Sequence, residues 1–280
     1  MPTALYINTV ITELDTTKRE ATGTGPVIAL QKVVQYVQQH RGIASALLNG
    51  NNSMTGRLTE TQQELNKAVD AVDAKMKESS VSAQNTSLWS MQKQRIAEIQ
   101  QAVSARQLKA PDSAAQHTKI VADLMLINEE IIEESDLLLD PVKHTYFLMS
   151  ASMLNAPRLA ENLGLMRATG TALLTAGNIT DEGRTRLAGI FGSVNMFLSD
   201  FMRSIEKATR SDPKIKAALE AKGSEVKALI DKVLLMANQE LLQAKELKLP
   251  ANEYFGEFTR AIDSIYAYNS IATDNLVQAL

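Results

Sequence analysis

The chain has 280 residues, 45% of them hydrophobic, and a formal net charge of −3. A slightly acidic chain is poorly suited to a nucleic-acid surface, and the lack of cysteine excludes disulfides and thiolate metal sites. The 13 glycines and 7 prolines tend to separate stretches of helix-forming residues, so the sequence predicts an all-α protein.

Membrane-targeting signals are missing from the sequence. No apolar run reaches the roughly eighteen residues that a membrane span requires. Met1-Pro2 leads into mixed polar sequence rather than a signal peptide. We therefore expect either a cytosolic protein or a segment that lies between two membrane spans.

The first half predicts a short leading helix followed by four longer helices. The leading helix covers residues 3–21 and ends at the sequence TGTGP, because Pro26 suits the first turn of a new helix. The helices that follow begin after turn-forming residues and each carries an apolar stripe. They are expected at 26–49, at 53–79, at 87–107 and from 110 to about 138.

The second half repeats this plan after a boundary at Asp140-Pro141. Its helices are expected at 142–176, 182–209, 213–247 and 251–280. The sequence RGIASALLNGN at 41–51 is echoed by RATGTALLTAGN at 167–178. The sequence therefore predicts two tandem up-and-down four-helix units, residues 1–139 and 140–280, related by duplication.

Arg41 interrupts the apolar stripe of the helix at 26–49. A buried arginine requires a partner, a solvated interface or a ligand, because an unpaired buried charge is costly. Residues equidistant from a turn lie at the same height in an antiparallel bundle. This places Arg41 level with Gln62, Ala102 and His117-Thr118, where no stripe carries a carboxylate. Gln62 is the polar exception on its own stripe and is a candidate site residue.

Arg167 interrupts the stripe of the corresponding helix in the second half. The same reasoning places it level with Phe191, Asp231 and residues 266–269. Asp231 is an expected ion-pair partner, so Arg167 is a candidate for either a structural or a ligand-binding role.

Catalytic and metal-binding signatures are not found. His40, His117 and His144 lack a second ligand at metal spacing, and the acidic pairs near residue 130 lack the Glu-x-x-His repeat of di-iron bundles. The sequence contains no phosphate-binding loop and no nucleophile elbow. We expect no enzymatic activity, no metal and no cofactor.

The sequence QKVVQYVQQHRGIASALLNGN at 31–51 resembles the first helix of the nitrate- and nitrite-sensing (NIT) type of sensor domain, which reads Q-[KR]-x-R-G-x-S/A-x-x-x-L. The sequences DPVKHTYFLM at 140–149 and PRLAENLGLMRATG at 157–170 resemble the middle of periplasmic sensor domains in methyl-accepting chemotaxis proteins. The resemblance implies that Arg41 binds a small anion and that Gly42 and Ser45 complete the motif. The second copy departs from it, with Ala168 after Arg167.

The same resemblance implies a biological setting. Such domains form the periplasmic part of an inner-membrane receptor, lie between two transmembrane helices, dimerise weakly when isolated, and bind a small anion such as nitrate, nitrite or a carboxylate. A different reading is a cytosolic helical scaffold or adaptor that binds partner helices, with both arginines ion-paired. An apolar span of about twenty residues beside each end separates the two readings.

Overall fold

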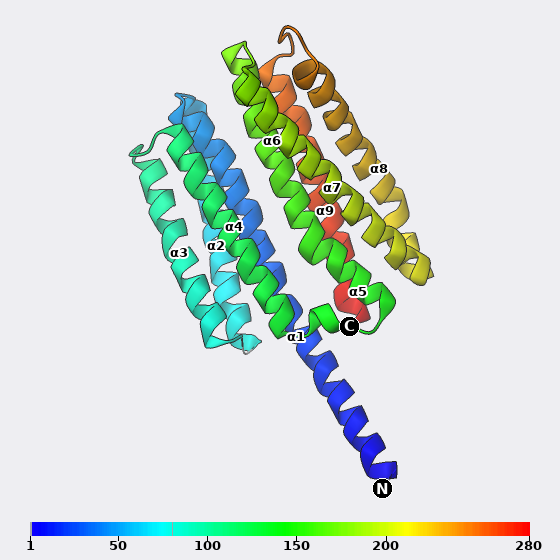
Figure 1. Cartoon of the computed structure of the whole chain (residues 1–280). Coiled ribbons are helices and arrows are strands. Elements are labelled where there is room, and N and C mark those ends of the chain that lie inside the picture. Colours follow the sequence, from blue (N-terminus) through cyan, green and yellow to red (C-terminus); the bar gives the residue numbers. More distant parts are fainter. Residues whose placement is uncertain (1, 80) are drawn as a thin grey trace. The chain divides into compact units, whose positions relative to one another are not determined.

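The computed structural model describes the backbone of residues 2–79 and 81–280, and the side chains of this part from Lys18 onward (Figure 1). Over this part the chain is helical and contains no strand, so the predicted all-α class is confirmed. The chain divides into two compact units with the boundary between Asp140 and Pro141. Within the described residues no helix is both long and apolar enough to cross a membrane.

The first unit is built around its first helix, which packs against the second and the fourth. Apolar side chains at helical spacing fill the space between the helices, among them Val34 and Val37 of the first helix and Leu124 of the fourth, all at most 2% exposed. The long helices are α1 (Pro2–Leu48), α2 (Thr55–Glu78), α3 (Ala83–Ser104) and α4 (Ala110–Glu134).

The expected break between a leading helix and the next helix is wrong, because α1 runs unbroken from Pro2 to Leu48 through Pro26. A proline has no N–H for the carbonyl four residues earlier, which here belongs to Thr22. The hydroxyl of Ser79, at the end of α2, donates to that carbonyl at 2.8 Å. Gly23 permits close packing, since a Cβ there would lie 2.2 Å from the Cβ of Ser135. Tertiary contacts thus replace what the local sequence lacks.

The second unit begins with a helical rod of three parts, in which a π-helical stretch (Ser150–Asn155) joins α5 (Lys143–Met149) to α6 (Ala156–Ala176). The helix α8 also ends in a π-helical stretch, at Leu242, about one turn before the predicted end at 247. The remaining long helices of this unit are α7 (Asp181–Ser211), α8 (Pro213–Ala237) and α9 (Ala251–Ala279). The duplication of one unit from the other stays a prediction.

Candidate functional site

The site in the first unit centres on Arg41, which lies two turns before the end of α1 and is 7% exposed. Its Nη1 donates to the hydroxyl of Thr118 on α4 at 2.8 Å. That hydroxyl gives its own hydrogen to the carbonyl of Ala114, one turn earlier, at 2.9 Å. The oxygen of Thr118 therefore turns a lone pair toward Arg41.

Beside Arg41, a buried chain of hydrogen bonds crosses from α2 through α1 to α4. The Gln62 amide nitrogen lies 3.1 Å from His40 Nε2, and His40 Nδ1 lies 2.7 Å from His117 Nε2. His117 Nδ1 then lies 2.7 Å from the carbonyl oxygen of Ser113. Neither histidine ring is exposed. The two histidines were not predicted as a pair, although His40 precedes Arg41 and His117 precedes Thr118 in the sequence.

Burial makes both histidines hard to protonate. Desolvation and then the neighbouring His117 lower the pKa of His40 from 6.5 to about 3. Desolvation lowers the pKa of His117 to about 4, helped by the positive charge of Arg41 and opposed by the hydrogen bond to Ser113. Both rings are therefore neutral at pH 7, and the positive charge of the site resides on Arg41.

In the second unit, Arg167 makes the same kind of contact. Its Nη1 donates to the hydroxyl of Thr259 on α9 at 2.7 Å, and that hydroxyl donates to the carbonyl of Phe255 at 2.8 Å. The Arg167 guanidinium also lies 4.6 Å from the centre of the Phe255 ring, a cation–π contact. The expected partner Asp231 is exposed and pairs with Lys227 instead. The expected Arg167–Asp231 ion pair is therefore wrong.

The surroundings of Arg167 differ from those of Arg41. Met166 and Phe258 precede Arg167 and Thr259, where the first unit has histidines, and both are fully buried. Tyr254, one turn before Phe258, stacks on it with ring centres 4.4 Å apart and donates from its hydroxyl to the Met166 carbonyl at 3.1 Å. The arginine–threonine contact therefore occurs in both units, next to a polar chain in one and an apolar cluster in the other.

A family model for nitrate and nitrite sensing matches residues 32–277, a range that includes both arginines and both threonines. The chain belongs to this NIT family. The resemblance found in the first helix is thereby confirmed over most of the sequence.

The NIT chain is also similar in fold to the solved structure of the NasR transcription antiterminator. The TM-score is 0.73, with 14% sequence identity over 99% of this chain and 73% of that chain. At this level of identity the similarity concerns the fold alone. None of the curated proteins matches the sequence.

The structure groups some of the predicted site residues of the NIT chain. Gln62 is half-buried and reaches the neighbourhood of Arg41 through His40, while its amide nitrogen also contacts the Gln100 carbonyl at 3.2 Å. Gly42 and Ser45 lie half-buried on α1, and the Ser45 hydroxyl makes no hydrogen bond to the described residues. Their part in ligand binding stays a prediction. Arg167 belongs to the second unit.

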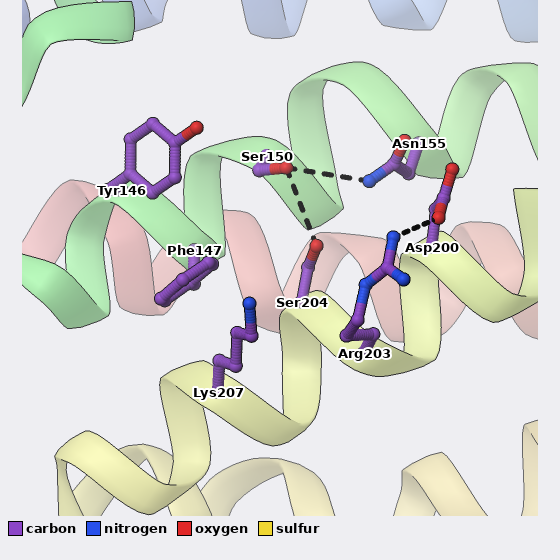
Figure 2. A pocket seen from close by; sticks show the side chains of 8 residues that line it. All are labelled: Tyr146, Phe147, Ser150, Asn155, Asp200, Arg203, Ser204 and Lys207. Carbon is purple, nitrogen blue, oxygen red and sulfur yellow. Dashed lines mark hydrogen bonds and ion pairs between the residues drawn. The ribbon is translucent and has the colours of Figure 1, made fainter.

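A second polar site in the NIT chain is a pocket of about 260 Å³ between α5, the π-helical stretch and α7 (Figure 2). Arg203 in this pocket is paired with Asp200, and the Lys207 ammonium lies 4.8 Å from the centre of the Phe147 ring. Both cations are exposed, and exposed charges attract anions weakly because water screens them. This pocket is therefore a poor candidate for anion binding.

Proposed function

We propose that the chain is a sensor domain that binds nitrate or nitrite through Arg41 and Arg167. The observation that supports this most directly is an arginine held by a threonine hydroxyl in each unit of a NIT-family chain, buried in the first unit and half-buried in the second. A guanidinium in a partly desolvated setting favours an anion strongly, because the local dielectric constant is low.

The geometry of a guanidinium suits the proposed ligands. Nitrate, nitrite and carboxylates are planar, and the guanidinium fork offers two parallel N–H donors to such a group. The hydrogen bond from Nη1 to Thr118 restricts rotation of the Arg41 guanidinium, so less rotational freedom is lost when an anion binds. Gln62, Gly42 and Ser45 complete the proposed neighbourhood of Arg41. The protein acts by binding, and the ligand is released unchanged.

We propose the periplasmic part of a methyl-accepting chemotaxis receptor as the setting, with flanking transmembrane helices and a weak homodimer. The fold likeness to NasR, a transcription antiterminator, favours a second candidate in which the domain controls antitermination. The gene sequence beside residues 1 and 280 separates them. An apolar span of about twenty residues on each side supports the receptor, and an attached polar domain supports the second candidate.

The direct test is the thermal stability of the full chain with sodium nitrate or nitrite, against sodium chloride at the same ionic strength. Ligand at about a hundred times its Kd adds about 2.7 kcal/mol to stability, which raises the Tm by several degrees. We expect Arg41→Ala to weaken the rise, and Arg41→Ala combined with Arg167→Ala to abolish it. Arg57→Ala, which changes an exposed arginine on α2, is the matched control and should retain it.

Equal effects of nitrate, nitrite and chloride would show a general salt effect and contradict the proposal. A nitrate-specific rise that is as large in Arg41→Ala as in the natural chain would remove Arg41 from the site.

A further inference from the structure

We infer that His40 and His117 are positioning residues for Arg41, acting through a hydrogen-bond chain that runs in one direction across the first unit. This inference rests on the proposed anion site, because it concerns how Arg41 is held there. The two histidines touch no ligand in this arrangement. They set the height and rotation of α1 against α4.

The direction of the chain follows from its last member. A backbone carbonyl can only accept, so His117 Nδ1 must carry the hydrogen that Ser113 receives. In a neutral ring His117 Nε2 is then an acceptor, and the hydrogen between the rings belongs to His40 Nδ1. His40 Nε2 is in turn an acceptor for the Gln62 amide. One arrangement of hydrogens satisfies the chain, and both histidines have the hydrogen on Nδ1.

The chain and the arginine contact bridge the same two helices at adjacent positions. The His40–His117 bond of 2.7 Å and the Arg41–Thr118 bond of 2.8 Å lie one residue apart on both α1 and α4. If α1 slid or rotated against α4, both bonds would break together. Buried polar groups that lose their partners are costly, so the fully buried histidines hold one register. Arg41 is thereby held where its Nη1 meets Thr118.

The second unit shows that the fold does not require this polar pair. Met166 and Phe258 fill the positions that precede Arg167 and Thr259, and both are buried without a polar atom in their side chains. Apolar contacts are not directional and tolerate small shifts of one helix on another. The hydrogen-bond chain of the first unit therefore fixes the position of α1 on α4 and is not required for folding. The second unit also supplies the substitutions that remove the chain.

The first experiment uses the unaltered full chain. Nitrogen-15 NMR of the imidazole rings reports the charge and tautomer of each histidine. We expect His40 and His117 both to be neutral at pH 7 with the hydrogen on Nδ1. A charged ring, or a hydrogen on Nε2 at either residue, overturns the inference.

The second experiment compares two double variants in nitrate binding measured by calorimetry. His40→Met with His117→Phe copies the second unit and removes the chain, whereas His40→Gln with His117→Gln keeps a donor and an acceptor at each position. We expect the first variant to weaken nitrate binding about tenfold or more, as loss of a supporting residue commonly does. The glutamine variant should stay within about threefold of the natural chain, since less than 1 kcal/mol separates such affinities. Unchanged binding by a folded Met/Phe variant overturns the inference.

A third measurement separates this inference from the proposed function. Rotation of the Arg41 guanidinium is measured by NMR exchange without any ligand. We expect the guanidinium to rotate slowly in the natural chain and in His40→Gln with His117→Gln. It should rotate faster in His40→Met with His117→Phe. If the natural chain binds no nitrate, the proposed function fails, and this rotation still decides the positioning role. Equal rotation in all three proteins overturns it.

Discussion

The two units hold an arginine by the same contact but surround it with different chemistry. In the first unit Arg41 and Thr118 follow two bonded histidines, whereas in the second Arg167 and Thr259 follow a methionine and a phenylalanine. The common part is a cation, a hydroxyl and a carbonyl one turn away. The difference shows that the arginine–threonine contact does not depend on one kind of core. The side chains around this contact determine how the stability of each unit depends on pH and on changes in packing.

The second unit relies on close packing of tyrosines against glycines. A Cβ at Gly170 would lie 2.4 Å from Cζ of Tyr254, and a Cβ at Gly223 would lie 2.7 Å from the Tyr268 hydroxyl oxygen. Both tyrosine rings are fully buried. The first unit instead has the imidazole rings of His40 and His117 beside Arg41, and these rings require hydrogen-bond partners. We therefore expect acid to destabilise the first unit most, and a change in side-chain volume to destabilise the second.

Acid should give the largest difference between the units. The pKa values of His40 and His117 are lowered in the folded state, so as the pH falls below 6.5 the unfolded chain binds protons that the folded chain excludes. Stability is therefore lost as the pH falls. Between pH 7 and 4.5 we expect the pair to remove up to about 5 kcal/mol from the free energy of unfolding.

Urea unfolding read from Trp89 fluorescence tests this, because the chain's one tryptophan is buried in α3 of the first unit. The variant His40→Gln with His117→Gln does not titrate in this range and should lose most of the pH dependence. An identical pH dependence in both proteins would show that the histidines do not cause it.

Gly170→Ala should destabilise the second unit by about 3 kcal/mol, because the stacked and buried Tyr254 ring cannot move aside. Urea unfolding followed by circular dichroism measures the change. Gly189→Ala on α7 is the control, since its Cβ would meet no atom within 4 Å. The control should gain about 0.5–1 kcal/mol from better helix propensity. Equal effects of the two substitutions would contradict the role of close packing.

Arg167→Gln should lower the free energy of unfolding by about 1–2 kcal/mol through loss of the Thr259 bond and the contact with Phe255. It should also weaken the nitrate response, as we expect Arg41→Gln to do. Thermal shifts of the two variants with and without nitrate provide the measurement. A full nitrate response in Arg167→Gln would confine the ligand function to the first unit and separate the two arginines.

Ser79→Ala should have the smallest effect, a loss of about 1 kcal/mol, because it leaves the Thr22 carbonyl of α1 without its donor. Pro26→Ala supplies the missing N–H, so the cost of Ser79→Ala should largely vanish in that background. Ser90→Ala, at an exposed hydroxyl on α3, serves as the neutral control. A cost that is the same in both backgrounds would refute the proposed compensation. The first helical rod of the second unit carries its proline, Pro157, two residues after the π-helical stretch.

Apolar periodicity and the turns predicted the helices well, because both are local properties of the sequence. Heights counted from the turns also placed Arg41 beside Gln62 and Thr118, which the structure confirms through His40 and the direct bond. The same method predicted Asp231 as the partner of Arg167 and was wrong. Counting residues from a turn gives the level of a residue along the bundle but does not give the face of α8 on which it lies. Asp231 faces solvent.

The remaining errors concern interactions between distant residues. The histidine pair was missed because each ring alone resembles an ordinary core residue, and the signal lay in two histidines at the same height. The break at Pro26 was predicted because a proline cannot donate a helical hydrogen bond. The hydroxyl of Ser79, from the end of α2, supplies the missing donor to the Thr22 carbonyl. The π-helical stretch at 150–155 was missed, although Pro157, which has no N–H for the Met153 carbonyl, lies just after it.

The unbroken course of α1 has a mechanical consequence. At a rise of 1.5 Å per residue, its 47 residues form a rod about 70 Å long. A proline often bends a helix, and here the hydroxyl of Ser79 donates to the Thr22 carbonyl that Pro26 leaves without its N–H. We therefore expect a displacement of Arg41 along the helix axis to reach the Pro2 end of α1, because the helix between them is unbroken.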